Sequence, residues 1–215
     1  MSKSNPSRRT FTKTALAGTA AAMSYPTTGF SKNKHIRLGG PVFGKNLSPE
    51  EWAQEHIKLG YTAAYCKLKP DTPDDVVSAY KKAAQKVGLI IAEVGAWSNP
   101  ISPNEDERKK AMEKCINNLD LADRIGANCC VNVSGSLHPS EWYGPHPDNL
   151  TKDTFDLIVE TTRKIIDAVK PKRTFWALET MPWTYPDSPQ SYFDLLKAMD
   201  RKQFAAHLDP VNMIC

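Results

Sequence analysis

The sequence predicts an α/β fold with a parallel sheet, a (β/α)8 TIM barrel of which this chain contains about six βα units. Three observations predict it. Strand-like and helix-like runs alternate from residue 35 onward, as in chains that form a parallel sheet. No glycine-rich nucleotide loop follows the first strand-like run. The later strand-like runs each have one apolar face and one face that turns polar toward the carboxyl end.

Six strands are predicted, at residues 35–43, 62–68, 89–96, 128–134, 174–180 and 204–209. Five helices are predicted between them, near residues 48–59, 74–87, 105–125, 151–170 and 188–200. Two helix starts have clear signals, because Ser48 opens a capping box and Ser188 is followed, like Ser48, by a proline. The helix ends are predicted at three glycines, Gly60, Gly88 and Gly126.

An open doubly wound sheet is the competing architecture. It is disfavoured because the segment GGPVFGK, residues 39–45, is neither a GxGxxG fingerprint nor a P-loop. Side chains alternate between the two faces of a strand, and in a barrel the inner face lines a site at the carboxyl mouth. We therefore expect the polar residues on these faces to converge there; they are Glu93, Asn132, Ser134, Glu179, His207 and Asp209.

Two carboxylates end neighbouring buried strands in this prediction. Glu179 follows FWAL and Asp209 follows FAAHL, and a buried carboxylate is unfavourable unless it is paired or binds a cation. An oxygen-rich site with a nearby imidazole, here His207, suits a divalent ion such as Mn, Mg, Co or Zn. A salt-bridged or water-bound pair in a cleft without metal is the alternative.

Residues 1–33 are predicted to be a targeting segment and linker, and residues 34–215 the barrel domain. The segment SRRTFTK precedes a mild apolar run, ALAGTAAAM, and resembles a twin-arginine export signal. We therefore expect a periplasmic or otherwise exported protein; a disordered basic tail is the alternative. The apolar run is too short to span a bilayer, which takes about 20 residues.

Charge and cysteine usage exclude several other classes. The net charge is +4, but residues 1–30 hold four basic and no acidic residues, which leaves 24 of each sign in the remainder. Such a balanced surface lacks the basic field that nucleic-acid binding requires. The five cysteines contain no CxxC pair, so we expect small buried thiols and no disulfide framework.

Four motifs resemble those of a known family. LETMPW (178–183) and HLDPVN (207–212) are similar to strands five and six of the xylose isomerase-like TIM barrels, the sugar phosphate isomerase/epimerase superfamily. AEVGAWSNP (92–100) and CCVNVSG (129–135) resemble the mouths of its strands three and four. The resemblance covers the chain from about residue 35 to its last residue.

The resemblance implies a metal site. Family members hold a divalent metal with Glu, Asp, His and Glu from strands five to eight; Glu179 matches the first ligand and Asp209 the second. The His and second Glu have no counterpart, and we expect a fragment of a chain of ~270–300 residues, because six strands cannot close the barrel. Asn212 stands where ketose 3-epimerases carry a substrate-binding His, which is a departure from that branch.

The expected function is therefore an exported, metal-dependent sugar isomerase or epimerase. By resemblance, it moves a proton next to a sugar carbonyl, with Glu179 as metal ligand and catalytic base and Asp209 as metal ligand. Two alternatives stay open: metal-assisted lyase or hydrolase chemistry on a glycoside or oxidised sugar, and a non-catalytic sugar-binding barrel. The endonuclease branch is disfavoured because the second and third strands end in YCKL and VGAW, without the histidines of its zinc site.

The substrate is expected to be a small-molecule carbohydrate, and further copies of the chain are the other expected partner. The residues expected to contact the sugar are His207, Asn212, Glu93, Trp97, Asn132 and Trp183. Several of them have an alternative role. Glu93 would instead form an ion pair with Arg37 or Lys67, and the two tryptophans would cover the core without binding a ligand. His138 and His146, in a long proline-rich loop, are expected to be surface residues without ligands.

Overall fold

The structure is a computed structural model that describes residues 36–44 and 46–214. It divides into two compact units, Met1–Arg37 and Leu38–Cys215, and every helix and strand of the described residues lies in the second. The twin-arginine segment predicted for residues 1–33 falls outside the described residues, so the export signal stays a prediction.

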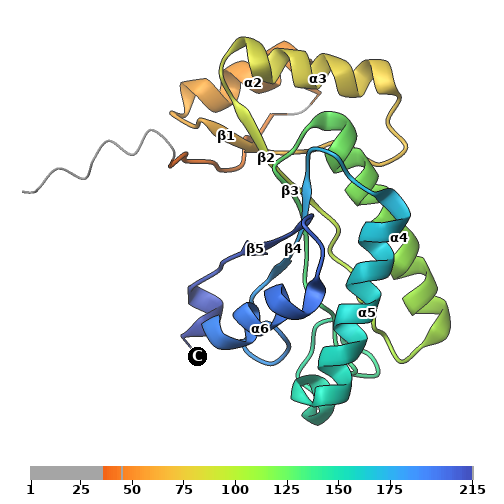
Figure 1. Ribbon diagram of the computed structural model, residues 1–215. Helices are drawn as coiled ribbons and strands as arrows, with labels where there is room; N and C mark the ends of the chain where they lie inside the picture. Colours follow the sequence, from red (N-terminus) through yellow and green to blue (C-terminus); the bar gives the residue numbers. More distant parts are fainter. Residues whose placement is uncertain (1–35, 45, 215) are drawn as a thin grey trace, which may run out of the picture. The chain divides into compact units, whose positions relative to one another are not determined.

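Five parallel strands form one sheet in the order β1-β2-β3-β4-β5 (Figure 1). Their bounds are β1 (Ala63–Tyr65), β2 (Ile90–Gly95), β3 (Cys129–Asn132), β4 (Phe175–Glu179) and β5 (Phe204–His207). Each strand pairs with the next one along the chain, without the reversal that creates the crevice of a doubly wound sheet. This is the strand order of a TIM barrel, so the predicted fold class is confirmed, here as an incomplete barrel.

Helices separate the strands where the sequence predicts them. Their bounds are α2 (Pro49–Lys58), α3 (Asp74–Lys86), α4 (Glu105–Ile125), α5 (Lys152–Val169) and α6 (Pro189–Met199), with short 3-10 turns η1 (Pro147–Leu150) and η2 (Val211–Met213). Ser48 and Ser188 both form the capping boxes that begin α2 and α6. Gly126 ends α4 in the left-handed conformation, at φ 78°, which an L side chain adopts only with strain.

The strand predicted for residues 35–43 is wrong. The described part of this segment has a single isolated bridge, between Gly39 and Ala63, and the Leu38 carbonyl accepts hydrogen bonds from Thr62 and Ala63. Gly39, Gly40 and Pro41 follow one another here, and glycine and proline weaken a strand interior. The segment therefore touches β1 without forming a ladder.

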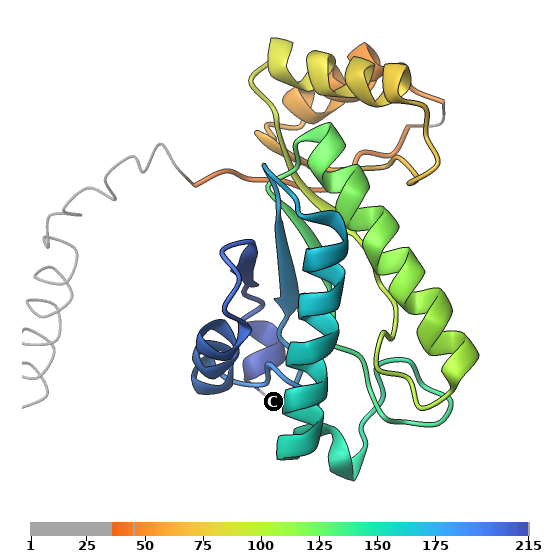
Figure 2. The same cartoon turned by 45° about the vertical axis from the view of Figure 1, so that its right-hand side comes forward.

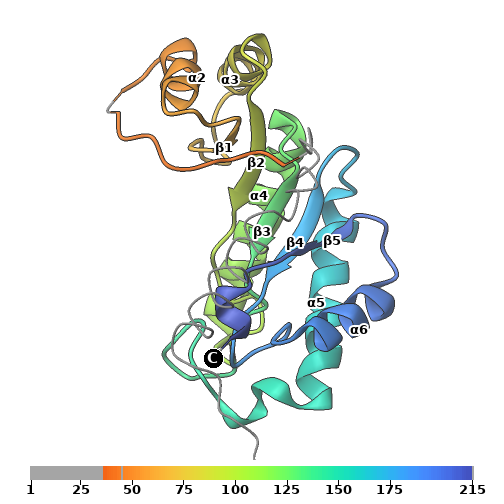
Figure 3. The same ribbon diagram turned by 90° about the vertical axis from the view of Figure 1, so that its left-hand side faces the viewer.

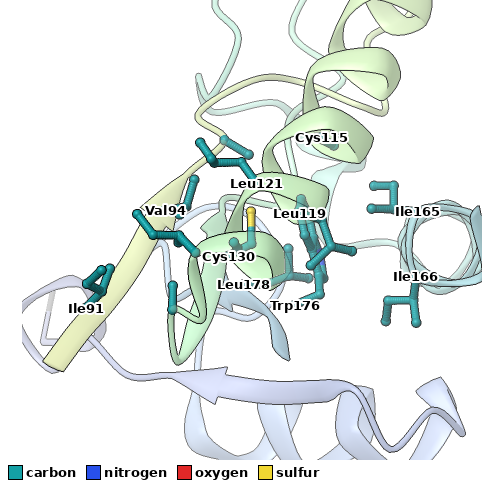
Figure 4. Close-up of a cluster of buried hydrophobic side chains, with 14 of the residues drawn as sticks. Ile91, Val94, Cys115, Leu119, Leu121, Cys130, Ile165, Ile166, Trp176 and Leu178 are labelled. Atoms are coloured by element: carbon teal, nitrogen blue, oxygen red, sulfur yellow. The ribbon is translucent and has the colours of Figure 1, made fainter. Parts of the chain in front are cut away.

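The core lies between the sheet and the layer made by α4 and α5 (Figure 2). Figure 4 shows side chains of the strands, among them Val94, Cys130 and Trp176, against Leu119 of α4 and Ile165 of α5. All five are at most 2% exposed, and burying such a side chain stabilises the fold by roughly 1.5–3 kcal/mol. Cys115 and Cys130 are buried, and the four described cysteines are all free, as expected.

The opposite face of the sheet corresponds to the inside of the barrel; Figure 3 views the strands from this side, with α4 and α5 behind them. Residues paired on neighbouring parallel strands point to the same side. The pairs Glu93–Cys129, Cys129–Phe175 and Glu179–His207 therefore define this inner face. The pairs Val94–Cys130 and Cys130–Trp176 define the face toward the helices.

Two of the predicted face assignments are corrected. On β3 the polar face points outward, because Asn132 pairs with Leu178 and both lie on the helix side. On β2 strict alternation would put Ile91 and Glu93 on the same face, but the register shifts between Ala64 and Tyr65. Ile91 pairs with the buried Ala64 and Glu93 with Tyr65, so these two residues lie on opposite sides of the sheet.

Candidate functional site

The carboxyl ends of β4 and β5 bring together Glu179, His207 and Asp209. Glu179 and His207 are partners in the parallel ladder and point to the same inner face. Asp209 lies two residues beyond His207, and its backbone is tied to Thr180: the Asp209 amide donates to the Thr180 hydroxyl (3.1 Å), which donates to the Asp209 carbonyl (2.8 Å). Thr180 is fully buried, so this link holds Asp209 beside the end of β4.

Tyr192 of α6 fixes the same edge from the helix side. Its hydroxyl donates to the Leu178 carbonyl of β4 and accepts a hydrogen bond from the His207 amide of β5 at 2.8 Å. Tyr192 is 3% exposed, and burial raises the pKa of its hydroxyl to about 12. The side chain therefore stays neutral and sets the spacing of the residues next to Glu179 and His207.

Asp209 lies close enough to Glu179 for its charge to act on the Glu179 carboxyl group. Burial raises the pKa of Glu179, and the negative charges of Asp209 and Glu93 raise it further, while His207 opposes them. Two half-buried carboxylates that lie close together repel each other unless a proton or a cation lies between them. The pair therefore has the electrostatics of a cation site or of a shared proton.

Glu93 reaches the same group of residues from β2. Its Oε2 atom lies 3.1 Å from Nε2 of His207, and the two side chains are only 16% and 28% exposed. This hydrogen bond raises the pKa of His207; burial opposes the shift, and the charges of Glu179 and Asp209 reinforce it. The other ring nitrogen, Nδ1, is buried without a hydrogen-bond partner among the described residues. Of the alternatives predicted for Glu93, Lys67 points elsewhere and donates to the Leu47 carbonyl.

The fit of this site to a metal ion rests on the two carboxylates. Among the described residues no group of three or more His, Cys, Asp and Glu side chains is arranged to hold a metal. Two carboxylates are, however, the protein share of many Mg²⁺ sites, in which water and substrate oxygens fill the remaining positions. The placement of Glu179 and Asp209 at the ends of neighbouring strands fits such a hydrated divalent ion.

Trp97 follows β2 and is folded back over the inner face of the sheet. Its backbone is left-handed, with φ 23°, and a Cβ atom on Gly95 would lie 2.1 Å from the indole nitrogen. A larger residue at position 95 would therefore displace the ring. Trp97 is 40% exposed and its carbonyl accepts a hydrogen bond from Lys114 of α4.

The expectation that Asn132 and Ser134 join the mouth is wrong. Asn132 is fully buried on the helix side, where its side chain accepts a hydrogen bond from the Ser98 amide (2.9 Å) and donates to the Ser98 carbonyl (3.1 Å). The Ser134 hydroxyl lies 3.0 Å from that of Thr184. These polar groups are satisfied by the protein itself, so Asn132 supports the turn beside Trp97 and is not placed to touch a sugar.

Trp183 belongs to a clamp of loops beyond β3 and β4. Its indole donates to the Tyr143 carbonyl, and its own carbonyl accepts a hydrogen bond from the buried Asn149 (3.1 Å). In the loop that follows β3, Nδ1 of His138 accepts hydrogen bonds from the amides of Ser140 and Glu141. Nδ1 of His146 likewise accepts a hydrogen bond from the Asp148 amide.

Asn212 lies just beyond Asp209, in η2, and its side-chain nitrogen is 3.7 Å from the sulfur of Met181. Asn212 is half-buried, and its contact with Met181 places it near the carboxyl end of β4. Three supporting residues were not predicted: Thr180, Tyr192 and Asn149. Tyr192 resembles an ordinary apolar helix residue in the sequence, and nothing in the spacing of Thr180 or Asn149 signals their hydrogen bonds.

The described residues contain no helix with the length and apolarity needed to cross a bilayer. A family profile described as xylose isomerase-like TIM barrel matches residues 53–215. No match is found among the curated proteins.

Solved structures of low sequence identity share the fold. An L-ribulose 3-epimerase is 15% identical, with a TM-score of 0.63 over 83% of this chain and 62% of its own. A D-psicose 3-epimerase from Clostridium cellulolyticum H10, solved with D-tagatose, is 18% identical, with a TM-score of 0.61 over 78% of this chain and 60% of its own. A xylose isomerase-like TIM barrel protein from Mycobacterium smegmatis, in complex with magnesium, is 17% identical, with a TM-score of 0.51 over 77% and 57%.

This chain therefore spans about three fifths of the length of these proteins. The family profile covers most of the chain, and the parallel strand order agrees with it. The chain belongs to the xylose isomerase-like TIM barrel family.

Proposed function

We propose that this chain carries part of the active site of an exported, metal-dependent sugar isomerase or epimerase. The observation that carries the proposal is that the hydrogen bonds between Thr180 and Asp209 hold Asp209 beside Glu179, at the ends of two neighbouring strands. The likeness to sugar 3-epimerases supports the substrate class, a small-molecule carbohydrate. The magnesium-bound relative of the same fold supports a divalent ion as cofactor.

The proposed chemistry is proton transfer next to a sugar carbonyl. Glu179 and Asp209 would hold the cation, which would polarise the sugar carbonyl as a Lewis acid. Glu179 takes the proton from the carbon beside the carbonyl, and a partner group returns a proton to the sugar. His207, whose ring is oriented by Glu93, lies beside Glu179 and contacts the substrate. Trp97 covers the inner face next to these groups and contacts the sugar ring.

Metal binding is the first test. The double variant Glu179→Gln with Asp209→Asn removes both negative charges with little change in shape, so we expect it to lose the divalent ion that the native chain binds. Metal content after dialysis and isothermal titration with Mg²⁺ and Mn²⁺ measure this. The matched control is Glu160→Gln with Asp156→Asn, two exposed acids in i,i+4 pairs on α5, which should leave binding unchanged. Retention of the ion by the first double variant would refute the site.

The reaction class needs its own measurement. A sugar isomerase or epimerase exchanges a carbon-bound proton with solvent, so incubation of candidate ketoses in deuterated water should place deuterium beside the carbonyl of the product. Mass spectrometry and NMR detect it. Release of an aglycone or of an unsaturated sugar, without such exchange, would support the lyase or hydrolase alternative instead.

A further inference from the structure

A pocket opens beyond the carboxyl end of β2, beside the turn that carries Trp97. Its volume is about 340 Å³, within the range of small-ligand sites. Two tryptophans and the first half of α4 form its walls; the lining residues used below are Trp97, Trp142, Glu107, Lys110, Ala111 and Lys114.

Both tryptophan side chains are partly open to solvent. Trp97 is 40% and Trp142 39% exposed, while Ala111 between them on α4 is 7% exposed. The walls therefore offer flat apolar surface, which suits the face of a sugar ring. Trp97 belongs to the inner face of the sheet as well, since its indole lies over Gly95 on the strand that carries Glu93. One ring thus lines the pocket and also lies over the strand that carries Glu93.

The pocket is built on a fixed scaffold. The Asn99 side chain joins the turn after β2 to the loop after β3, because it donates to the Ser136 carbonyl (2.7 Å) and accepts from the Ser136 amide (3.0 Å). Gly135 permits this approach: its φ is 102°, and a Cβ atom there would lie 2.1 Å from Oδ1 of Asn99. Further along the loop the ring of Trp142 packs edge-on against Tyr143, with ring centroids 4.7 Å apart.

The charged groups that line the pocket are two lysines and one glutamate, which leaves an excess of positive charge. Asn99 is committed to Ser136, the Ser98 hydroxyl lies 3.3 Å from Sγ of Cys115, and Oε2 of Glu107 accepts from Ser102. Lys114 uses one proton on the Trp97 carbonyl and has two left. The Lys110 ammonium makes no hydrogen bond or ion pair within the part of the chain that the structure describes.

We propose that this pocket binds the ring of a sugar acid, with its apolar face on the tryptophans and its carboxylate on Lys110 and Lys114. The role of the pocket as a subsite for the substrate rests on the proposed function. The binding of a sugar acid in the pocket does not depend on it. A substrate that extends from the Glu179–Asp209 pair past Trp97 would place a uronate unit there. The substrate class then becomes an acidic sugar or a glycoside that contains one.

The test uses the full chain freed of metal, with glucuronate as the probe and glucose as its neutral match. In calorimetric or NMR titration, glucuronate should bind at least about tenfold more tightly than glucose. A charge-assisted contact is worth about 1.4 kcal/mol or more, which corresponds to this factor. Lys110→Gln should weaken glucuronate by about the same factor and leave glucose unchanged. Trp142→Ala should weaken the binding of both sugars. The control Lys82→Gln on α3 should change the binding of neither.

Three results would overturn the proposal: no binding of glucuronate at millimolar concentration, equal affinity for glucose, or full binding by the Lys110→Gln variant. Lys110 has no described structural contact, so its variant tests the pocket without the unfolding risk of Lys114, which holds the Trp97 carbonyl. Glu179→Gln with Asp209→Asn separates the two proposals. If that variant loses the metal but still binds glucuronate, both the metal site and the sugar-acid pocket are supported. If it keeps the metal, the proposed function fails and the pocket is unaffected.

Discussion

At the residue scale, the contact between Glu93 and His207 organises the candidate site. The two residues are 114 positions apart in sequence, and their side chains meet at 3.1 Å on the inner face of the sheet. Hydrogen bonding to the Glu93 carboxylate favours the protonated imidazole and fixes the orientation of the ring. The free nitrogen of His207 is thereby aimed by a residue on a different strand.

This contact makes a pH-dependent contribution to the metal-free protein. Because folding raises the pKa of His207 above 6.5, the stabilisation is fully present below that unfolded value and is lost as the pH rises through the folded pKa. We expect Glu93→Gln to lower the pKa of His207, and to reduce stability by on the order of 1 kcal/mol below about pH 6. NMR titration of the histidine ring protons measures the first effect and urea unfolding the second.

The control is Glu141→Gln, an exposed carboxylate in the loop that contains His138. It should leave the titration of His207 unchanged. An unaltered pKa in Glu93→Gln would mean that the Glu93 contact does not control this imidazole.

At the scale of elements, α6 acts as a brace for the two strands that carry the candidate site. A single hydroxyl, that of Tyr192, links the carbonyl at the end of β4 to the amide at the end of β5. The helix begins at a capping box on Ser188, so its first turn is fixed where it presents Tyr192 to the sheet. Local helix structure and site geometry are therefore coupled through one side chain.

We expect Tyr192→Phe to lower the free energy of unfolding by about 1–3 kcal/mol, because it leaves two buried backbone groups without their partner. Urea denaturation measures this loss, and metal affinity should fall with it because Glu179 and Asp209 lose their spacing. Tyr143→Phe is the matched control: Tyr143 is 41% exposed, and the structure shows no hydrogen bond of its hydroxyl among the described residues. Equal stability of the two variants would contradict the bracing role of Tyr192.

At the scale of the whole molecule, the fold leaves one face of the sheet for chemistry and one for packing. Helices α4 and α5 cover the packing face, and every labelled residue of the core in Figure 4 lies between these layers or at their edges. The inner face carries Glu93, Glu179 and His207. Apart from its first 30 residues the chain has no net formal charge, which agrees with a neutral or small charged ligand better than with a polyanion.

The proposed export depends on the arginine pair rather than on positive charge. Fusion of residues 1–33 to a reporter protein should carry it across the inner membrane, and Arg8→Lys with Arg9→Lys should abolish this while keeping the charge. Lys3→Arg with Lys13→Arg is the control that keeps the charge and leaves the pair intact. Fractionation of the periplasm measures the outcome; export of the Arg8→Lys, Arg9→Lys fusion at the native level would refute the signal.

The sequence by itself determined the α/β class, the five helices to within about two residues at each end, and the two carboxylates that end β4 and β5. Capping residues and the periodicity of apolar side chains encode these features locally, so they are readable without a fold. Only the tertiary structure decided which face each strand turns inward. Alternation fixes the period of a strand but not its phase, and the register shift in β2 and the buried partners of Asn132 set that phase through packing. The pairing of Glu93 with His207 was likewise beyond reach, because it depends on side chains brought together from β2 and β5.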